Sequence, residues 1–343
     1  MSSLKKRELK AKSYSKPNSR KYAFTSPLAL GLLAAVPAAK DPIDAILWHA
    51  GALIIESGMT GPPYSPASYA AHRKVQQIIH RDMEVDGRLL TCPKGFIIEL
   101  REDRPQERKN FTCAHELGHT FFYESVPTIK YRTSTSSQPH HDQEEEMLCN
   151  IAAAELLMPS CVFSKIAMDY YPSPQSLQQL AKLFETSITA TVVHLLRLRT
   201  WNSTFILWQR KDEKLTAGWV ARPGRGLIYS PLLEINNFQS SSIHQTFVTG
   251  EATTSQEWLC LDNGFKLCNV QSIRLNSQKV LSCISHTSHQ SKSICQHKAD
   301  PQMLPLKYEC ECDGTGWRLI QREGRTYAAR CRALQHKTYQ ANS

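Results

Sequence analysis

The chain has 343 residues, which is enough for two or three domains that each bury a core, and it carries a net charge of +10. Residues 1–22 carry eight Lys/Arg against one acid and residues 298–343 carry eight against five, so the middle of the chain is close to neutral. No apolar run approaches the roughly 18 residues that a membrane-spanning helix needs, which excludes such a helix.

The cysteine content points to a reducing compartment. There are eleven cysteines, an odd number, and Cys113, Cys149 and Cys161 lie in apolar surroundings where an unpaired cysteine behaves as a small hydrophobe. We therefore expect a cytoplasmic protein without a disulfide framework. The apolar residues 28–36 imitate a signal peptide, but the basic region before them is unusually long and contains prolines.

Residues 1–40 are expected to form a basic, disordered tail. A helix is predicted to begin at Asp41-Pro42, because proline is favoured at the first helical position, and apolar spacing continues it to residue 54. A loop follows, and a second helix is predicted over residues 68–79. The basic ends are suited to contact nucleic acid, although a solvated tail is the simpler interpretation.

A small β unit is predicted next. Asp86-Gly87 is typical of a hairpin turn, and residues 95–100 have the composition of a strand. Residues 96–100 are a candidate edge strand that aligns a peptide by strand addition, and the alternative is an ordinary core strand.

The segment 110–119 contains the pattern H-E-x-x-H within a helix predicted from about residue 108 to residue 123. His115 and His119 are four residues apart, so one helix face presents both imidazoles to one point. This arrangement is typical of a zinc site, with Glu116 beside it as a general base. A catalytic zinc needs a third protein ligand.

The third ligand is expected in the helix predicted over residues 143–159, after a polar loop at residues 124–142. Glu144, Glu145 and Glu146 are the candidates, and their alternative role is to complement the dipole of a helix start. Glu146 is favoured because Asn150 lies one turn further on the same face and can bond a ligating imidazole. His140 and His141 in the loop are better interpreted as solvated residues than as metal ligands.

Beyond this helix the pattern predicts a helical hairpin and then strands. Residues 175–198 resemble a helix-turn-helix, for which packing is the simpler interpretation and DNA reading the alternative. Residues 201–295 alternate between apolar strand-like runs and polar breaks, which predicts a β-rich domain.

The basic tail at residues 296–343 contains Cys310, Cys312 and Cys331. Together with Cys295, His297 or His336 they would hold a second, structural zinc. The spacing departs from paired C-x-x-C motifs, so a degenerate ribbon without metal is the alternative.

The motifs together resemble the ImmA/IrrE family of metallopeptidases over roughly residues 41–200. The resemblance rests on residues 110–119, on Glu146-x-x-x-Asn150 followed by Leu-Leu-Met-Pro, and on the upstream Gly-Pro-Pro and Asp-Gly-Arg-Leu-Leu segments. One departure is Ala152, at a place where the family has an aromatic residue.

The resemblance implies an α+β protein with a mainly helical, zincin-like domain and a small β-sheet at residues 41–200, ending in the helical hairpin. It implies zinc bound by His115, His119 and Glu146, with Glu116 as general base in peptide hydrolysis. Tyr123, one turn past His119, is a candidate for oxyanion stabilisation. The implied substrate is a helix-turn-helix repressor, and the β-rich domain would be a sensor. The alternatives are a zinc-containing protein that inactivates a repressor without cleaving it, and a nucleic-acid-binding protein.

Overall fold

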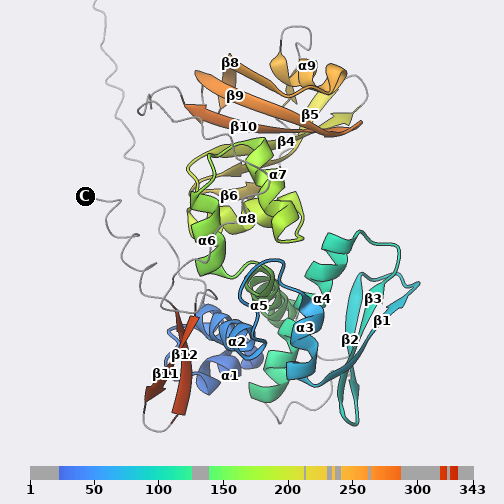
Figure 1. Cartoon of the computed structure of the whole chain (residues 1–343), viewed down its shortest axis with the longest axis vertical. Helices are drawn as coiled ribbons and strands as arrows, with labels where there is room; N and C mark the ends of the chain where they lie inside the picture. Colours follow the sequence, from blue (N-terminus) through green and yellow to red (C-terminus); the bar gives the residue numbers. More distant parts are fainter. Residues whose placement is uncertain are drawn as a thin grey trace, which may run out of the picture.

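The computed structural model describes residues 23–125, 139–211, 214–229, 234–235, 241–261, 264–286, 317–322 and 325–330. These residues form an α+β structure. Figure 1 shows a large antiparallel sheet at one end of the molecule and helices α1–α5 with a small sheet at the other. Helices α6–α8 lie between these two parts.

The first part is mainly helical. Helix α2 begins where the sequence predicts, because the Asp41 carboxylate accepts a hydrogen bond from the Asp44 backbone N–H and Pro42 occupies the first turn. The helical elements are α1 (Pro27–Ala35), α2 (Pro42–Glu56), α3 (Pro66–Ala70), the 3-10 turn η1 (Ala71–Arg73), α4 (Gln106–Ser125) and α5 (Pro139–Leu157).

The prediction of a disordered tail at residues 1–40 is wrong for the second half of that segment. This stretch contains helix α1, whose Leu32 is fully buried in the core that α1 shares with α2 and α4. Glu144 of α5 accepts hydrogen bonds from the backbone N–H groups of Thr25 and Ser26 just before α1. The apolar residues that imitate a signal peptide instead bury one face of a helix, and residues 1–22 lie outside the described part.

The helix predicted for residues 68–79 is also wrong in its second half. α3 and η1 end at Arg73, Lys74 has a positive φ of 57°, and strand β1 follows. β1 pairs in parallel with β3, with Ile78 opposite Ile98. Pairing with an apolar strand outweighs the weak helical spacing, because β-branched residues such as Ile78 fit a half-buried sheet surface.

The small sheet contains β1 (Val75–Arg81), β2 (Gly87–Cys92) and β3 (Gly95–Arg101) in the order β1-β3-β2. β3 is therefore the middle strand, and residues 96–100 are not the predicted edge strand but a core strand with Ile98 and Leu100 buried. β2 is an edge strand. The turn between β2 and β3 lies at residues 93–94, so the hairpin turn expected at residues 86–87 is wrong and Gly87 begins β2.

Helices α6 (Ser160–Met168), α7 (Pro174–Leu183) and α8 (Ile188–Leu198) follow α5. α7 and α8 form the helical hairpin predicted at residues 175–198. Their inner faces, which include Leu180 and Leu195, are buried in the main core, as the packing interpretation requires.

The large sheet is antiparallel, with the order β6-β5-β4-β10-β9-β8, and β7 pairs with β5. Residues alternate between its faces: Phe205 and Leu207 join the main core, whereas Ile206 and Trp208 form a second core with Ile243 of α9. The elements are β4 (Thr204–Lys211), β5 (Lys214–Arg222), β6 (Gly226–Ile228), β7 (Glu234–Ile235), α9 (Ser242–Thr249), β8 (Thr253–Leu261), β9 (Gly264–Asn276) and β10 (Lys279–His286).

Strands β11 (Trp317–Arg322) and β12 (Arg325–Arg330) form an antiparallel pair beside α2 (Figure 1). Cys310, Cys312 and Cys331 lie outside the described residues, so the second zinc site stays a prediction. In the described segments, no single helix is both long and apolar enough to cross a membrane. Residues 143–157 and α6 are long and apolar enough only when they are counted together, and the chain bends by 57° between them.

Candidate metal centre

Helix α4 brings the two histidines of the H-E-x-x-H segment to one point. It extends from Gln106 to Ser125, two residues beyond the predicted bounds at each end. The Nε2 atoms of His115 and His119 are 3.2 Å apart. Both side chains are largely buried, with 14% and 11% of their surface exposed.

Helix α5 brings the third predicted ligand to the same point. The Glu146 carboxylate lies 3.1 Å from Nε2 of His115 and 3.6 Å from Nε2 of His119, and 48% of the Glu146 side chain is exposed. α5 begins at Pro139 rather than at the predicted residue 143, so the carboxylates lie in its second turn and not at its start. Their alternative role, which is to complement the dipole at the start of the helix, is therefore less favoured.

The two helices approach each other closely at Gly118. A Cβ atom added there would lie 3.1 Å from Cα of Cys149 and 3.3 Å from Cβ of Ala152. Glycine allows the backbones to meet, and the small side chain of Ala152 lies against it. This contact determines how near Glu146 comes to the histidines.

Each imidazole is held at its other nitrogen. Nδ1 of His115 lies 3.1 Å from Oδ1 of Asn150, and Nδ1 of His119 lies 2.8 Å from Oε1 of Glu145. Oxygen acceptors at both Nδ1 atoms favour the tautomer that is protonated at Nδ1 and leaves the lone pair of Nε2 for a metal. Asn150 thus has the position that the sequence predicts for it.

The three consecutive carboxylates of α5 have three different surroundings. Glu144 is fully buried and bonds the backbone before α1, Glu145 is buried and bonds His119, and Glu146 alone is half-exposed beside both Nε2 atoms. Burial lowers the pKa of His119, while the hydrogen bond to Glu145 and the neighbouring carboxylates raise it, with a net raised pKa. A bound cation would displace that proton.

The donor set fits zinc, because two imidazoles and one carboxylate are ligands that a catalytic zinc commonly has. The structure also offers another third donor: the Cys149 sulfur lies with the histidine donor atoms in a group whose members are within 4.8 Å of one another. Cys149 is fully buried, whereas the Glu146 carboxylate lies 3.1 Å from Nε2 of His115 and borders the open cavity. We favour Glu146, because a catalytic site needs a position open to substrate.

Glu116 lies beside the histidines and close to the edge strand. It is 7% exposed, and a Cβ atom added to Gly87 would lie 3.4 Å from its Oε1 atom and 2.3 Å from Cγ2 of Thr112. Only glycine fits at the start of β2 in this arrangement. The candidate base is therefore enclosed between α4 and the backbone of β2.

A cavity of about 1110 Å³ opens over these residues. One of its walls is β2 with the flanking residues 86 and 93, and another contains His115, Glu116 and Glu146. The opposite edge of β2 pairs with β3, so β2 borders the cavity as an edge strand. Tyr123 also lines the cavity, 38% exposed and with its ring 5.1 Å from that of Phe96.

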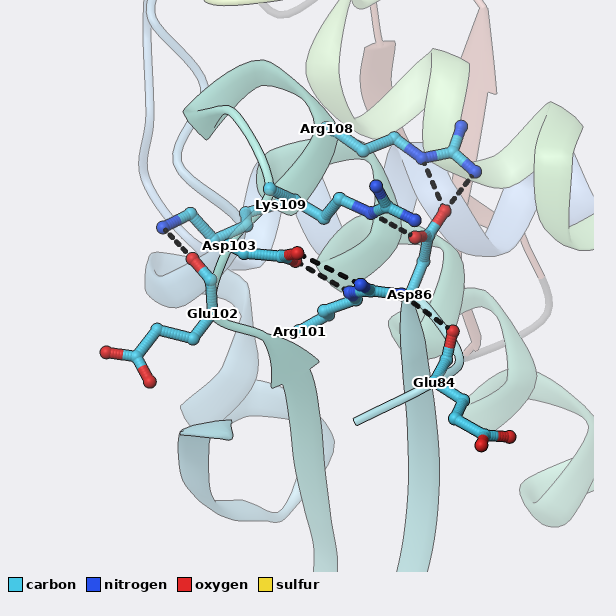
Figure 2. A network of polar contacts seen from close by, with 8 residues as sticks. Glu84, Asp86, Arg101, Glu102, Asp103, Arg108 and Lys109 are labelled. Carbon is cyan, nitrogen blue, oxygen red and sulfur yellow. Dashed lines mark hydrogen bonds and ion pairs between the residues drawn. The ribbon is translucent and has the colours of Figure 1, made fainter. Parts of the chain in front are cut away.

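Asp86 ties the edge strand to Arg108 in the first turn of α4 and to Arg104 just before that helix. Its carboxylate accepts hydrogen bonds from Nε of Arg104 at 2.6 Å and from Nε of Arg108 at 2.8 Å. Figure 2 shows the Asp86–Arg108 pair and, beside it, the pair formed by Arg101 and Asp103. The hydrogen bonds from Arg108 and Arg104 hold the pKa of Asp86 below its usual range. Asp86 precedes Gly87 directly, so this anchor also positions the backbone beside Glu116.

Sequence reasoning missed two parts of the site. The bond from Glu145 to His119 was missed because three adjacent carboxylates look alike in the sequence, although Glu145 lies four residues before Cys149 on the face buried toward α4. The lining residue Leu28 of α1 was missed because its segment was assigned to the tail. The run of apolar residues at positions 28–36 is the sequence feature that could have predicted α1.

The comparisons with known proteins concern the same part of the chain. A family model described as the IrrE N-terminal-like domain of peptidase M78 matches residues 74–196. The radiation response metalloprotease IrrE of Deinococcus radiodurans is 30% identical over 103 residues, which are 30% of this chain and 31% of that protein. Its namesake in Deinococcus deserti is 27% identical over 103 residues, which are 30% of this chain and 37% of that protein.

These matches span about a third of the length of the curated relatives. Among solved structures, a Mycobacterium tuberculosis transcriptional regulator aligns over 76% of this chain and 80% of its own, with a TM-score of 0.41 and 14% identity. The sequence matches support a metallopeptidase domain, and that domain includes the helix pair α4–α5.

Proposed function

From the premise that residues 74–196 belong to the ImmA/IrrE family of metallopeptidases, we propose that this protein is a zinc-dependent endopeptidase. One observation carries the proposal: Nε2 of His115 and Nε2 of His119 face the Glu146 carboxylate at the wall of a large cavity. His115, His119 and Glu146 would hold the zinc. A zinc ion in such a site acts as a Lewis acid and lowers the pKa of water toward about 7.

The chain's own residues supply the positioning and the proton transfer. Asn150 and Glu145 hold the imidazoles in the orientation that ligation needs. Glu116, enclosed between α4 and β2, would accept the proton of the attacking water and return it to the leaving amine. Tyr123 stays the candidate donor to the oxyanion, because its exposed side chain lines the cavity.

The edge strand β2 would align the substrate. An edge strand presents backbone N–H and C=O groups that can pair with an extended peptide, and side-chain pockets then supply specificity. β2 borders the cavity on the side of Glu116, which is where a peptide bond must lie to be attacked. This role replaces the one that the sequence suggested for residues 96–100.

For the biological substrate we propose a DNA-binding repressor of the helix-turn-helix type, acting in stress-response transcription, from the resemblance to the ImmA/IrrE family. The relatives of the two Deinococcus species are named as radiation response metalloproteases, and this chain matches only part of them. We further propose a cytoplasmic location, because buried cysteines such as Cys113 behave as small hydrophobes, as is usual in a reducing compartment.

The variant Glu116→Gln tests the mechanism. It should retain as much zinc as the wild type and lose cleavage of a helix-turn-helix repressor offered as substrate, measured by gel and mass spectrometry. The matched control is Gln106→Glu in the first turn of the same helix, outside the cavity lining, which should cleave normally. If Glu116→Gln releases the repressor from its operator as well as the wild type does, the protein sequesters its partner and the hydrolytic proposal is wrong.

A further inference from the structure

A second cavity, of about 490 Å³, lies between helices α5 and α8 beside the candidate metal centre. Its volume is within the range of about 300–1,000 Å³ that is typical of ligand pockets. Residues of α5 form one wall and residues of α8 form the other. We call it the α5–α8 groove.

The α5–α8 groove is continuous with the metal centre. Glu146 and Asn150 line both the groove and the large cavity over the histidines. On α5 they belong to one helical stripe with Met147, Ile151 and Ala154, which extends into the groove. A peptide bound at the metal centre would therefore lie next to the groove, on the side of α5.

Four apolar side chains line the groove, beside the polar residues Gln143, Glu146, Asn150, His194 and Arg197. Met147, Ile151 and Ala154 face Val193 of α8, which is 43% exposed. An exposed apolar side chain in a concave wall favours an apolar ligand, because burying it removes apolar surface from water.

The charge at one wall of the groove is already neutralised. Arg197 of α8 bonds Oε2 of Glu155 at 2.8 Å, and Glu155 is fully buried. The same carboxylate accepts hydrogen bonds from the backbone N–H and the hydroxyl of Ser160. Arg197 is thus held by a fixed counter-charge, so it gives the groove little preference for an acidic ligand.

We propose that the α5–α8 groove is a specificity pocket that takes a large apolar side chain of the peptide being cut. The inference rests on the proposed function, since it places the peptide across the metal centre. The occupant is the substrate rather than another segment of this chain, because the groove shares Glu146 and Asn150 with the cavity where the peptide bond would lie. The substrate class is a peptide with Leu, Met, Ile or Phe near the scissile bond.

The test uses binding, so that it does not depend on turnover. The probes are two series of peptide hydroxamates, whose hydroxamate group binds zinc, with the peptide extending to the N-terminal or to the C-terminal side. Each series carries Leu, Phe, Ala or Asp next to the hydroxamate. On the zinc-loaded full chain, one series should bind Leu or Phe at least about 10-fold tighter than Ala, as expected for a pocket that discriminates by apolar bulk. Asp should bind weakest.

Two variants locate that preference. Ala154→Trp fills the groove and Val193→Glu places a charge in it, and each should reduce the Leu-over-Ala ratio to within about threefold without changing the affinity for the Ala probe. Val248→Glu is the matched control, because Val248 is 62% exposed on α9 at the far sheet, and it should keep the full ratio. Using two groove variants guards against one that fails to fold.

Equal affinities for Leu and Ala in both series, or a preference that survives both groove variants, would overturn the inference. The second outcome would assign the groove to another occupant, such as residues 126–138 of this chain. The variant Glu116→Gln separates this test from that of the proposed function. It should keep the Leu-over-Ala ratio whether or not Glu116 is the base, since Glu116 does not line the groove.

Discussion

In the helix pair α4–α5, buried polar side chains converge on one point beside a cavity, whereas Ser272, Ser282 and Trp208 in the large sheet pair with one another. His115 and His119 face each other and Glu146 through Nε2 and are held by Asn150 and Glu145 through Nδ1. This arrangement gathers three metal-donor groups at one point in the wall of a cavity.

In the sheet, the buried side chains of Ser272, Ser282 and Trp208 bond one another. The Ser282 hydroxyl lies 2.7 Å from that of Ser272, its neighbour across β9 and β10, and it accepts a hydrogen bond from Nε1 of Trp208 at 3.0 Å. Within the described residues, the one group of three metal-donor side chains that lie together is at the helix pair.

The difference separates polar groups that stabilise the fold from polar groups that are available for chemistry. A buried polar side chain normally has a partner, and local pairing accounts for Ser282 fully. At the helix pair, the partners at Nδ1 instead orient groups whose other atoms stay available, which is the arrangement of a binding site. Variants in the two regions should therefore change different quantities.

The largest effect is expected from the third ligand. Glu146→Ala should weaken zinc binding by more than about 100-fold, because losing a residue that only orients a ligand already costs about 10–100-fold. The measurement is zinc competition with a chelator of known affinity. Cys149→Ala should leave zinc affinity nearly unchanged, since the thiol is fully buried away from the cavity. The reverse result would make Cys149 the third ligand and Glu146 a cavity residue.

A smaller effect is expected from the residue that orients His119. Glu145→Ala should lower zinc affinity by about 10–100-fold, because His119 loses its acceptor at Nδ1. Glu145→Gln keeps a carbonyl oxygen and should recover most of the loss. Asn150→Ala should cost less than Glu145→Ala, since Asn150 is exposed and water can replace its oxygen. Equal losses for Glu145→Gln and Glu145→Ala would contradict an orienting role.

In the sheet the expected change is in stability and not in zinc affinity. Ser282→Ala leaves the Trp208 N–H without its acceptor in the core and should lower the free energy of unfolding by about 1–3 kcal/mol. Ser272→Ala should cost less, because the bond from Trp208 to Ser282 remains. Urea unfolding measures both, and zinc titration should give wild-type affinity. A zinc affinity reduced in Ser282→Ala would show that the two regions are coupled.

The local pattern predicted much of the helix pair. H-E-x-x-H has a fixed helical spacing, so His115 and His119 had to share a face, and Asn150 had to follow Glu146 by one turn. The spacing to Asn150 favoured Glu146 among the three carboxylates, but the separate contacts of Glu144 and Glu145 could not be predicted from the local sequence. These contacts depend on the rotation of α5, which is constrained by the close approach at Gly118 and by the hydrogen bonds that Glu144 accepts from the backbone before α1.

The remaining errors concern pairing between distant segments. The edge position of β2 depends on strand order, and the strand β1 exists because Val75 and its neighbours pair with β3. A short apolar run has the same composition in a helix and in a strand, so periodicity alone did not resolve residues 68–79. The same limit applies to residues 28–36, whose place depends on the surface against which they pack.

The smallest effect is expected at the anchor between β2 and α4. Asp86→Asn removes the charge that Arg104 and Arg108 bind, and both arginines are more than one third exposed, so the loss at pH 7 should be about 0.2–1 kcal/mol for each pair. Because folding lowers the pKa of Asp86, its contribution is fully present above the unfolded pKa of about 3.9. That contribution is lost as the pH falls through the lower folded pKa.

The difference in unfolding free energy between wild type and Asp86→Asn should therefore be constant from about pH 5 to 7 and shrink below about pH 4. A difference that grows on acidification would show that the carboxyl group is stabilised in its protonated form. Zinc affinity should be unchanged, while KM for a cleaved peptide should rise more than kcat falls, since Asp86 positions the edge strand and does not touch the metal centre.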